Sequence, residues 1–278
     1  MAALAALLTV SGKGVAQEPA PGAPRMESTE DLIARLTPEQ KQRFDEATRD
    51  FDRRLFSEAL PIYKELLAQL AGDAVLTKFA SEAALNVGDA GFARSALKPV
   101  TTANPNDWQA AALLTRACAE SGDAACRDSG MVHMMDLHKQ GVTPPGLRQY
   151  IVERIPVGEK TLVIQTSLEP WGRFHVYDLG QLMDKEGKLV VRITLESDDA
   201  DQGMFASEHP KEAAAGVRRF SFDGYRETIN NSGQPVQAHS TYKLLDGQPS
   251  YDSVRKEFME IAKGKGNPAT SSTQPAAH

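Results

Sequence analysis

The sequence predicts an α+β protein in which an array of helical hairpins, an α-solenoid, is followed by an antiparallel β domain with a C-terminal helix. The first observation is an internal repeat, because Gly-Asp-Ala at positions 88–90 recurs 34 positions later, at 122–124. That period is the length of one repeat made of two helices. The second is a change of composition. Residues 38–140 are rich in Ala, Leu, Glu and Arg, whereas residues 148–245 are rich in the β-branched and aromatic residues that favour strands.

Length and charge limit the classes of protein to consider. The chain has 278 residues, of which 41% are hydrophobic, and a formal net charge of −6. This length suits two modest domains. Basic residues are scattered, so no broad cationic face is expected and nucleic-acid binding is disfavoured. Beyond the first dozen positions no run of 18 apolar residues occurs, and no membrane span is expected.

The first residues resemble an export signal. Residues 2–10 are apolar and residues 11–17 include several small side chains, as in a secretory signal that would occupy residues 1–17. The basic residues that normally precede the apolar core are missing. Residues 18–36 begin with a Pro- and Ala-rich stretch and are expected to form a disordered linker. A periplasmic or secreted protein is therefore expected, with a short core helix in a cytoplasmic protein as the alternative.

The first helix of the array is predicted to begin at Thr37. Thr37 would be the N-cap, Pro38 would occupy the first turn, and Gln40 would complete a capping box. A second helix is expected with Ser57 as its N-cap, which places Pro61 in the first turn, where proline is tolerated. The apolar residues that would share one face of the first helix are Phe44, Ala47, Phe51 and Leu55.

Several residues in this half follow a repeat pattern. Small residues are expected where helices cross, at Ala59, at Ala96 and, one repeat later, at Gly130, and the repeated turns contain Gly88 and Gly122. These five are the predicted repeat packing positions. The pattern is completed by Phe56, Phe92, Trp108, the sequence Asn104-Pro105-Asn106, and the aspartates Asp73 and Asp107, which also lie 34 positions apart.

In these residues the chain resembles the tetratricopeptide repeat family, over about three units between residues 38 and 140. The first unit lies two or three residues out of phase, and the large aromatic residue that starts each first helix appears only as Trp108. The resemblance implies a stack of helix pairs, residues 37–141, whose concave face holds a protein or peptide partner. It implies no catalytic motif and no cofactor.

Cys118 and Cys126 are the two cysteines of the chain, and they flank a predicted turn at residues 121–123. In an exported protein the pair would form a disulfide across a helical hairpin. In a cytosolic protein they would be two small buried thiols. Both interpretations remain open on sequence alone, and two ligands do not make a zinc site.

The second half begins after a hinge at residues 143–146, Thr-Pro-Pro-Gly, which neither a helix nor a central strand accepts. Turns are expected at residues 184–188 and 230–233, so neighbouring strands would pair antiparallel. A β-sandwich-like domain over residues 147–262, closed by a helix at residues 250–262, and a disordered tail at residues 263–278 are expected. The candidate strands are residues 149–155, 161–166, 173–177, 189–195, 218–222 and 236–244.

Candidate chemistry is weak. Met131, His133, Met134, Met135 and His138 offer soft metal ligands, but the two histidines face different sides of a helix, so core packing is favoured. The acidic run at residues 196–203 lacks the glutamate that closes a calcium loop and is interpreted as a solvated turn. Trp171, Phe174 and Tyr177 are either sheet core or a stacking platform, and His175, His209 and His239 could converge in space.

These observations favour a non-enzymatic interaction protein, whose helical repeats bind a protein or peptide. No catalytic residue, metal ligand or cofactor is assigned, because the chain has no Gly-x-Ser-x-Gly motif and no phosphate-binding glycine loop. The alternative is a β module that binds carbohydrate or lipid and is carried on a helical arm. A hydrolase built from scattered Asp, Glu and His is the third hypothesis.

Overall fold

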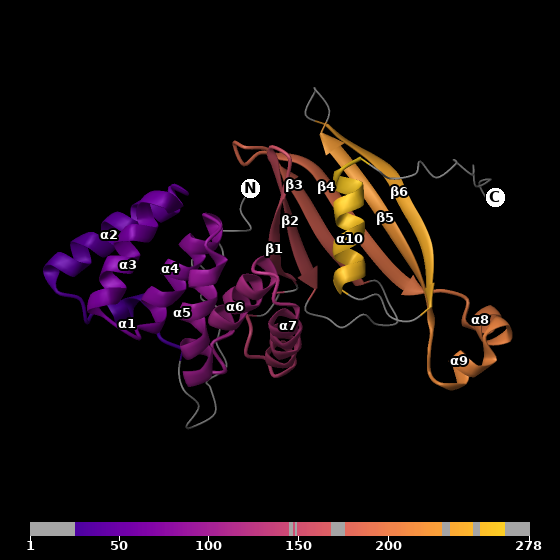
Figure 1. The fold of residues 1–278 in the computed structure, drawn as a ribbon, viewed down its shortest axis with the longest axis horizontal. Coiled ribbons are helices and arrows are strands. Elements are labelled where there is room, and N and C mark those ends of the chain that lie inside the picture. Colours follow the sequence, from indigo (N-terminus) through magenta and orange to yellow (C-terminus); the bar gives the residue numbers. More distant parts are fainter. Residues whose placement is uncertain are drawn as a thin grey trace. The chain divides into compact units, whose positions relative to one another are not determined.

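A computed structural model describes residues 26–144, 147, 149–167, 176–229, 234–246 and 251–264. The expected signal at residues 1–17, the aromatic pair Trp171 and Phe174, the turn at 230–233 and the tail beyond residue 264 lie outside the described residues. The chain divides into two compact units, Met1–Pro145 and Gly146–His278, and the division falls within the Pro-rich segment at 143–146 (Figure 1).

The first unit is an array of helices, as predicted. Each helix from α2 to α6 packs against the next one in the chain, so that α2 pairs with α3, α4 with α5, and α6 with α7 (Figure 1). The helices are α1 (Thr29–Ile33), α2 (Pro38–Asp52), α3 (Phe56–Gln69), α4 (Ala74–Asn86), α5 (Ala90–Ala103), α6 (Trp108–Glu120) and α7 (Ala124–Lys139).

Part of the expected disordered linker is ordered. Ser28 caps α1 with a capping box to Asp31, and Leu32 is 0% exposed because α1 packs against α4. The segment at 18–36 therefore does not end where the sequence predicts, since its last third adds a helix to the array.

An apolar core runs through the first unit from Leu32 to Ala117. It contains a group of four rings, in which the Phe79 ring centroid lies 5.5 Å from that of Phe44, 5.7 Å from that of Phe51 and 5.6 Å from that of Tyr63. Burial raises the pKa of the Tyr63 hydroxyl, which lies 3.3 Å from Thr48 Oγ1. The contacts of Phe79 with Phe44 and Phe51 are edge-on and that with Tyr63 is stacked, and aromatic contacts of both kinds stabilise a core beyond their buried area.

The predicted start of α2 is confirmed, but that of α3 is wrong. The Gln40 amide donates to Thr37 Oγ1 at 3.2 Å, and the Thr37 amide donates to the Gln40 side chain at 3.0 Å. Helix α3 instead begins at Phe56, with Leu55 as an N-cap that makes no side-chain hydrogen bond. Because the turn before it is so short, Pro61 lies inside α3 rather than in its first turn.

The second unit contains one six-stranded antiparallel sheet with the strands in sequence order, so the expected β-sandwich is not formed by the described strands. The strands are β1 (Gln149–Val157), β2 (Lys160–Ser167), β3 (Val176–Met183), β4 (Leu189–Asp199), β5 (Arg219–Ile229) and β6 (Pro235–Asp246). Two short helices, α8 (Gln202–Glu208) and α9 (Pro210–Ala214), join β4 to β5 (Figure 1).

The acidic run at 196–203 is not a solvated turn. Glu196 to Asp199 belong to β4, which pairs with β5 through Asp199, and the Asp201 carboxylate caps α8 by accepting from the Met204 amide at 2.9 Å. The first residues of the run are therefore part of a long strand, and its last acidic residue, Asp201, is the N-cap of a helix.

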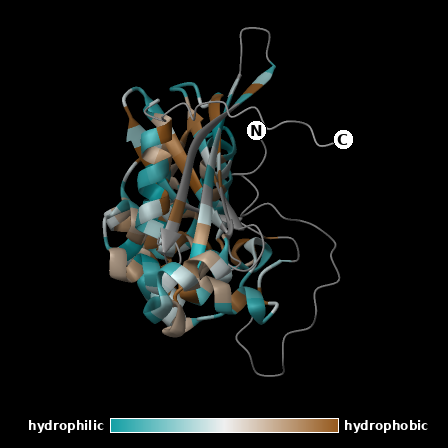
Figure 2. Ribbon diagram, turned by 90° about the vertical axis from the view of Figure 1, so that its right-hand side faces the viewer, coloured by the Kyte–Doolittle hydropathy of each residue, from teal (hydrophilic) through white to brown (hydrophobic). Residues whose placement is uncertain are grey.

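The predicted C-terminal helix is present as α10 (Tyr251–Ala262) and lies across β2, β3 and β4 (Figure 1). Val254, Phe258 and Ile261 are buried against the sheet. At Gly180 an added Cβ would lie 2.6 Å from the Phe258 ring, so the helix approaches the backbone of β3 closely. Figure 2 shows helices and strands of mixed hydropathy, as expected when each element buries one side.

An ion pair between the buried Glu153 and the half-buried Arg255 holds α10 on the sheet. Arg255 donates two hydrogen bonds of 2.7 Å to the carboxylate of Glu153 on β1, and the Tyr251 hydroxyl donates a third at 3.1 Å. The hydrogen bonds to Glu153 raise the pKa of the Arg255 guanidinium. Both oxygens of the buried carboxylate are therefore used within the second unit.

Candidate binding grooves on the helical array

The five predicted repeat packing positions fall into different environments. Ala59 is 0% exposed at the α3 crossing, and Gly130 lies where α7 meets α6, since an added Cβ would be 2.2 Å from Thr115 Oγ1. Ala96 differs, because it is half-buried and the neighbouring Ala93 is the fully buried small residue of α5.

Gly88 and Gly122 are turn residues rather than packing residues. Each follows a first helix of the array with a positive φ, 86° and 76°, and an added Cβ at either would contact nothing within 4 Å. Each glycine adopts the left-handed backbone conformation that ends a helix, and other residues adopt this conformation only at a cost in free energy.

Every helix from α4 to α7 begins at an aspartate that makes two kinds of contact. One carboxylate oxygen accepts from a backbone amide in the first turn, as an N-cap does, and the other accepts from a cation that lies 25 to 38 residues earlier in the chain. The four aspartates and their cations are Asp73 with Arg35, Asp89 with Lys64, Asp107 with Lys78, and Asp123 with Arg94.

These N-cap ion pairs connect each helix with an earlier part of the array. Lys64 lies on α3 and reaches the N-cap of α5, and its ammonium also lies 4.1 Å from the centre of the Phe92 ring. The hydrogen bond from Lys64, with that of the Phe92 amide, lowers the pKa of Asp89. The repeat in the sequence identifies the aspartates. It does not identify the cations, because the number of residues between a cation and its aspartate differs from pair to pair.

A groove with a volume of about 660 Å³ opens on the first unit along α5. It lies between the end of α3, the start of α4 and one face of α5. Most of its lining is small or apolar, and Ala96 lies in it. The lining residues are Glu27, Leu67, Ala71, Gly72, Ala74, Thr77, Phe92, Ala96, Pro99, Val100, Ala103, Asn104 and Asp107.

A second groove, of about 260 Å³, repeats the first one unit later, between α5, α6 and α7. Five of its positions lie 34 residues after lining positions of the first groove: Thr101 after Leu67, Ala111 after Thr77, Cys126 after Phe92, Gly130 after Ala96, and His133 after Pro99. The remaining lining residues are Thr102, Leu114, Thr115 and Ser129. The two hollows are therefore equivalent surfaces of successive repeats.

Helices α4 and α6 offer little open surface. All residues of α4 from Val75 to Leu85 are buried, including the charged side chains of Lys78 and Glu82. In α6 the residues from Trp108 to Ala119 are buried except Gln109 and Leu114. The hollows are instead lined largely by the second helices α3, α5 and α7.

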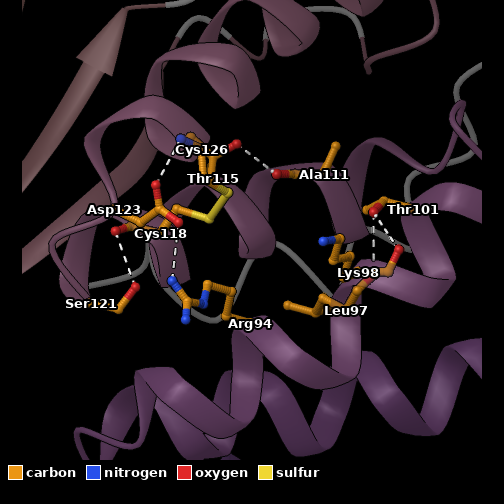
Figure 3. The surroundings of a disulfide bond; sticks show 10 residues. All are labelled: Arg94, Leu97, Lys98, Thr101, Ala111, Thr115, Cys118, Ser121, Asp123 and Cys126. Atoms are coloured by element: carbon orange, nitrogen blue, oxygen red, sulfur yellow. Dashed lines mark hydrogen bonds and ion pairs between the residues drawn. A yellow bond between two sulfur atoms is a disulfide. The ribbon is translucent and has the colours of Figure 1, made fainter.

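Cys118 and Cys126 form a disulfide, with Cα atoms 5.6 Å apart, that joins α6 to α7 beside the second groove (Figure 3). Cys118 is 0% exposed, whereas Cys126 is half-buried and lines the groove. The Cys126 amide also donates to Asp123 at 3.1 Å, so the turn between the helices is fixed by both a covalent bond and a cap.

The candidate soft ligands on α7 lie in different environments. On α7, Met134 is buried, His133 Nε2 lies 2.7 Å from the Pro105 carbonyl oxygen, and His138 Nδ1 lies 2.8 Å from Thr143 Oγ1. Within the described residues, no group of three or more His, Cys, Asp or Glu side chains could hold a metal ion. His209 stacks on Phe205, while His175 and the side chains of Tyr177 and His239 lie outside the described residues.

The chain has few recognisable similarities to known proteins. No protein-family model and no curated protein matches the chain. Among solved structures, the Sgt2 TPR domain from Aspergillus fumigatus is similar at 18% sequence identity, over 38% of this chain and 70% of that chain, with a TM-score of 0.34. No helix in the described part of the chain is both long and apolar enough to cross a membrane.

Proposed function

We propose that the protein is a non-enzymatic interaction protein of the tetratricopeptide-repeat type, in which the helical array binds a segment of a protein partner. The observation that carries the proposal is the repeated groove, with two equivalent hollows lined at positions one repeat apart. Repeat proteins present such equivalent surfaces in series, so that one extended ligand contacts several of them.

The lining favours an apolar ligand. Leu67, Phe92 and Val100 surround the larger hollow, and the acids beside it, Glu27 and Asp107, are already paired with Arg35 and Lys78. A pocket of this composition takes up aliphatic or aromatic side chains and excludes unpaired charge. We expect a partner segment with an apolar side chain that enters the larger hollow and a second side chain, one repeat along, that enters the smaller hollow lined by Thr101, Ser129 and His133.

A non-enzymatic role is supported by how the reactive side chains of the second groove are used. Cys126 is held in the disulfide, and the His133 ring contacts the Pro105 carbonyl oxygen. Neither is available as a nucleophile paired with a base. The alternative, a carbohydrate- or lipid-binding β module, is not proposed, because both hollows on which the proposal rests lie in the first unit.

The proposal is tested by selecting peptides from a random library against the full chain and measuring their affinity by fluorescence polarisation. Ala96→Arg places a long charged side chain in the larger hollow and should weaken binding at least about tenfold, the effect of losing one well-filled pocket. Ser95→Arg is the matched control, since Ser95 is the adjacent, exposed residue of α5 and does not line the hollow. Equal affinity of both variants would contradict the proposal.

We further propose that the protein is exported to an oxidising compartment. The support is the disulfide, because such bonds persist outside the reducing cytosol. Rapid alkylation of whole cells, followed by mass analysis of the protein, should find both cysteines unmodified before reduction and alkylated after it. Free thiols in the native protein would indicate the cytoplasmic alternative.

A further inference from the structure

The two hollows of the array are equivalent in position but differ in chemistry. Where the larger hollow is lined by Leu67 and Pro99, the smaller hollow is lined, 34 residues later in each case, by Thr101 and His133. An apolar side chain that suits the larger hollow would leave these polar groups without partners, which is unfavourable. The two hollows therefore call for different side chains. The other hydroxyl groups that line the smaller hollow belong to Thr102, Thr115 and Ser129.

Two threonines of α5 can act toward a ligand only as hydrogen-bond acceptors. Thr101 Oγ1 donates to the carbonyl oxygens of Leu97, at 3.2 Å, and Lys98, at 3.1 Å (Figure 3). Thr102 Oγ1 donates to the Lys98 carbonyl oxygen at 2.8 Å. A hydroxyl has one hydrogen and two lone pairs, so the hydrogen is used within the helix and the lone pairs remain. Thr101 is half-buried and Thr102 is exposed, so a ligand can reach both.

His133 on α7 adds an acceptor of the same kind. Its Nε2 lies 2.7 Å from the Pro105 carbonyl oxygen, which can only accept, so Nε2 carries the hydrogen in this contact. In the neutral ring Nδ1 then has a lone pair and no hydrogen. The exposed Ser129 hydroxyl can rotate to accept as well. Thr115 differs, because it is 0% exposed and its hydroxyl donates to the Ala111 carbonyl oxygen at 2.8 Å.

The place of the two threonines on α5 also favours a positive charge. Thr101 and Thr102 belong to the last turn of α5, which ends at Ala103, and the C-terminal end of a helix carries partial negative charge. None of the described residues that line the smaller hollow is a lysine or arginine, and the exposed Lys98 one turn earlier is not part of the lining. The chain as a whole has a net charge of −6, which attracts a basic segment.

We propose that the smaller hollow binds the ammonium group of a lysine in the partner segment, one repeat along from the apolar side chain that enters the larger hollow. An ammonium has three hydrogens and no lone pair, so it can donate to the Thr101 and Thr102 hydroxyl oxygens. Its alkyl stem occupies the rest of the hollow of about 260 Å³. A carboxylate, which only accepts, is excluded by the same lone pairs. This inference rests on the proposed function and adds what the bound segment must carry.

The test uses the peptides that are selected from the random library against the full chain and that lose affinity in Ala96→Arg. These peptides should carry a lysine at a fixed distance from an apolar residue. Replacing that lysine with methionine, which has a similar length and no donor, should weaken binding at least about tenfold, as expected for the loss of charge-assisted hydrogen bonds. Glutamate at the same position should weaken binding further. Fluorescence polarisation measures all three affinities.

The variant Thr101→Val with Thr102→Val removes both acceptors and keeps the branched shape of the side chains. It should bind the lysine and methionine peptides with affinities that differ by less than about twofold. Ser95→Ala is the matched control and should keep the full preference for lysine. The Ser95 hydroxyl also donates to a carbonyl oxygen of α5, that of Gly91 at 3.0 Å, but Ser95 lines neither hollow.

The outcomes separate this inference from the proposed function. Peptides that depend on Ala96 but bind equally well with lysine or methionine would overturn this inference and leave the proposed function standing. An unchanged preference for lysine in the double valine variant would overturn it as well, because the acceptors would then lie elsewhere. If no selected peptide depended on Ala96, the proposed function would be wrong, and this inference with it.

Discussion

Lys78 and Asp107 form an ion pair in which both side chains are 2% exposed and the Lys78 ammonium lies 2.8 Å from the carboxylate. Replacing Lys78 with Met leaves a buried carboxylate without its counter-charge, although the aspartate still caps α6. We expect Lys78→Met to lower the free energy of unfolding of the first unit by about 3 kcal/mol, the usual cost of breaking a buried pair. Urea denaturation followed by circular dichroism measures it.

The matched control is Arg94→Met, which removes the equivalent N-cap ion pair with Asp123 at the surface. Those side chains are 42% and 38% exposed, so the change should be below about 1 kcal/mol. If both variants lost the same free energy of unfolding, the contribution of the Lys78–Asp107 pair to stability would not depend on its burial.

Gly130 is the other residue whose environment allows a sharp prediction. In Gly130→Ala the new methyl group would meet Thr115 Oγ1 and Cγ2, so the α6–α7 crossing must open, at a cost of about 1–3 kcal/mol for overpacking. Thr115→Ala in the same chain should recover part of the loss, which a double-mutant cycle detects in thermal unfolding.

Gly91→Ala on α5, where an added Cβ meets nothing, is the control and should be neutral or stabilising. If Gly91→Ala were also destabilised, the loss in Gly130→Ala could not be assigned to the contact between α6 and α7.

At the scale of the helix, the N-cap aspartates make the array sensitive to acid. The Lys64 ammonium and the Phe92 amide lower the pKa of Asp89 in the folded protein, whereas in the unfolded chain this pKa is ordinary, about 3.9. The unfolded state therefore binds the proton more readily, so the contribution of Asp89 is present above its unfolded pKa and is lost as the pH falls through the folded value.

Asp89→Asn keeps a good N-cap but removes this titration. We expect the wild type to lose more stability than Asp89→Asn as the pH is lowered below about 4, and the two to change in parallel at higher pH. Urea midpoints measured across this range test the expectation. Curves that stay parallel down to the lowest pH would show that the ion pair with Lys64 contributes nothing to the folded state.

Element boundaries were predictable where the signal is local. The capping box at Thr37 marks the start of α2, because a cap involves residues three positions apart in the chain. Pro61 misled the prediction of α3, since a short turn rather than a polar cap begins that helix. The single sheet was also missed, because alternation identifies strands but does not say whether they form one layer or two.

The grooves could be predicted only in part. The repeat identified Ala96 and Gly130, which prove to be equivalent lining positions of the two hollows. The hollows themselves depend on how far apart α3, α5 and α7 lie, which the sequence does not contain. The cations of the N-cap ion pairs were missed for the same reason, since each reaches its aspartate through the stacking of helices rather than through spacing along the chain.

At the scale of the whole molecule, the first unit should fold without the second, and α1 should be part of it. The apolar core from Leu32 to Ala117 lies within residues 26–145, and Leu32 is 0% exposed in it. A fragment of residues 26–145 should therefore unfold cooperatively, with a helical circular dichroism spectrum. Removing residues 26–36 deletes α1, uncovers part of α4 and breaks the Arg35–Asp73 ion pair.

The shorter fragment, residues 37–145, begins where the repeats themselves begin and should be less stable by about 2–5 kcal/mol, the range for removing a large buried aliphatic side chain from a core. Leu32→Ala in the longer fragment should account for most of this difference, because Leu32 is the buried residue of α1. Solenoids need such a terminal element to cover the open side of their first repeat. If both fragments had the same urea midpoint, α1 would not belong to the folding unit; if neither folded, the array would depend on the β unit for its stability.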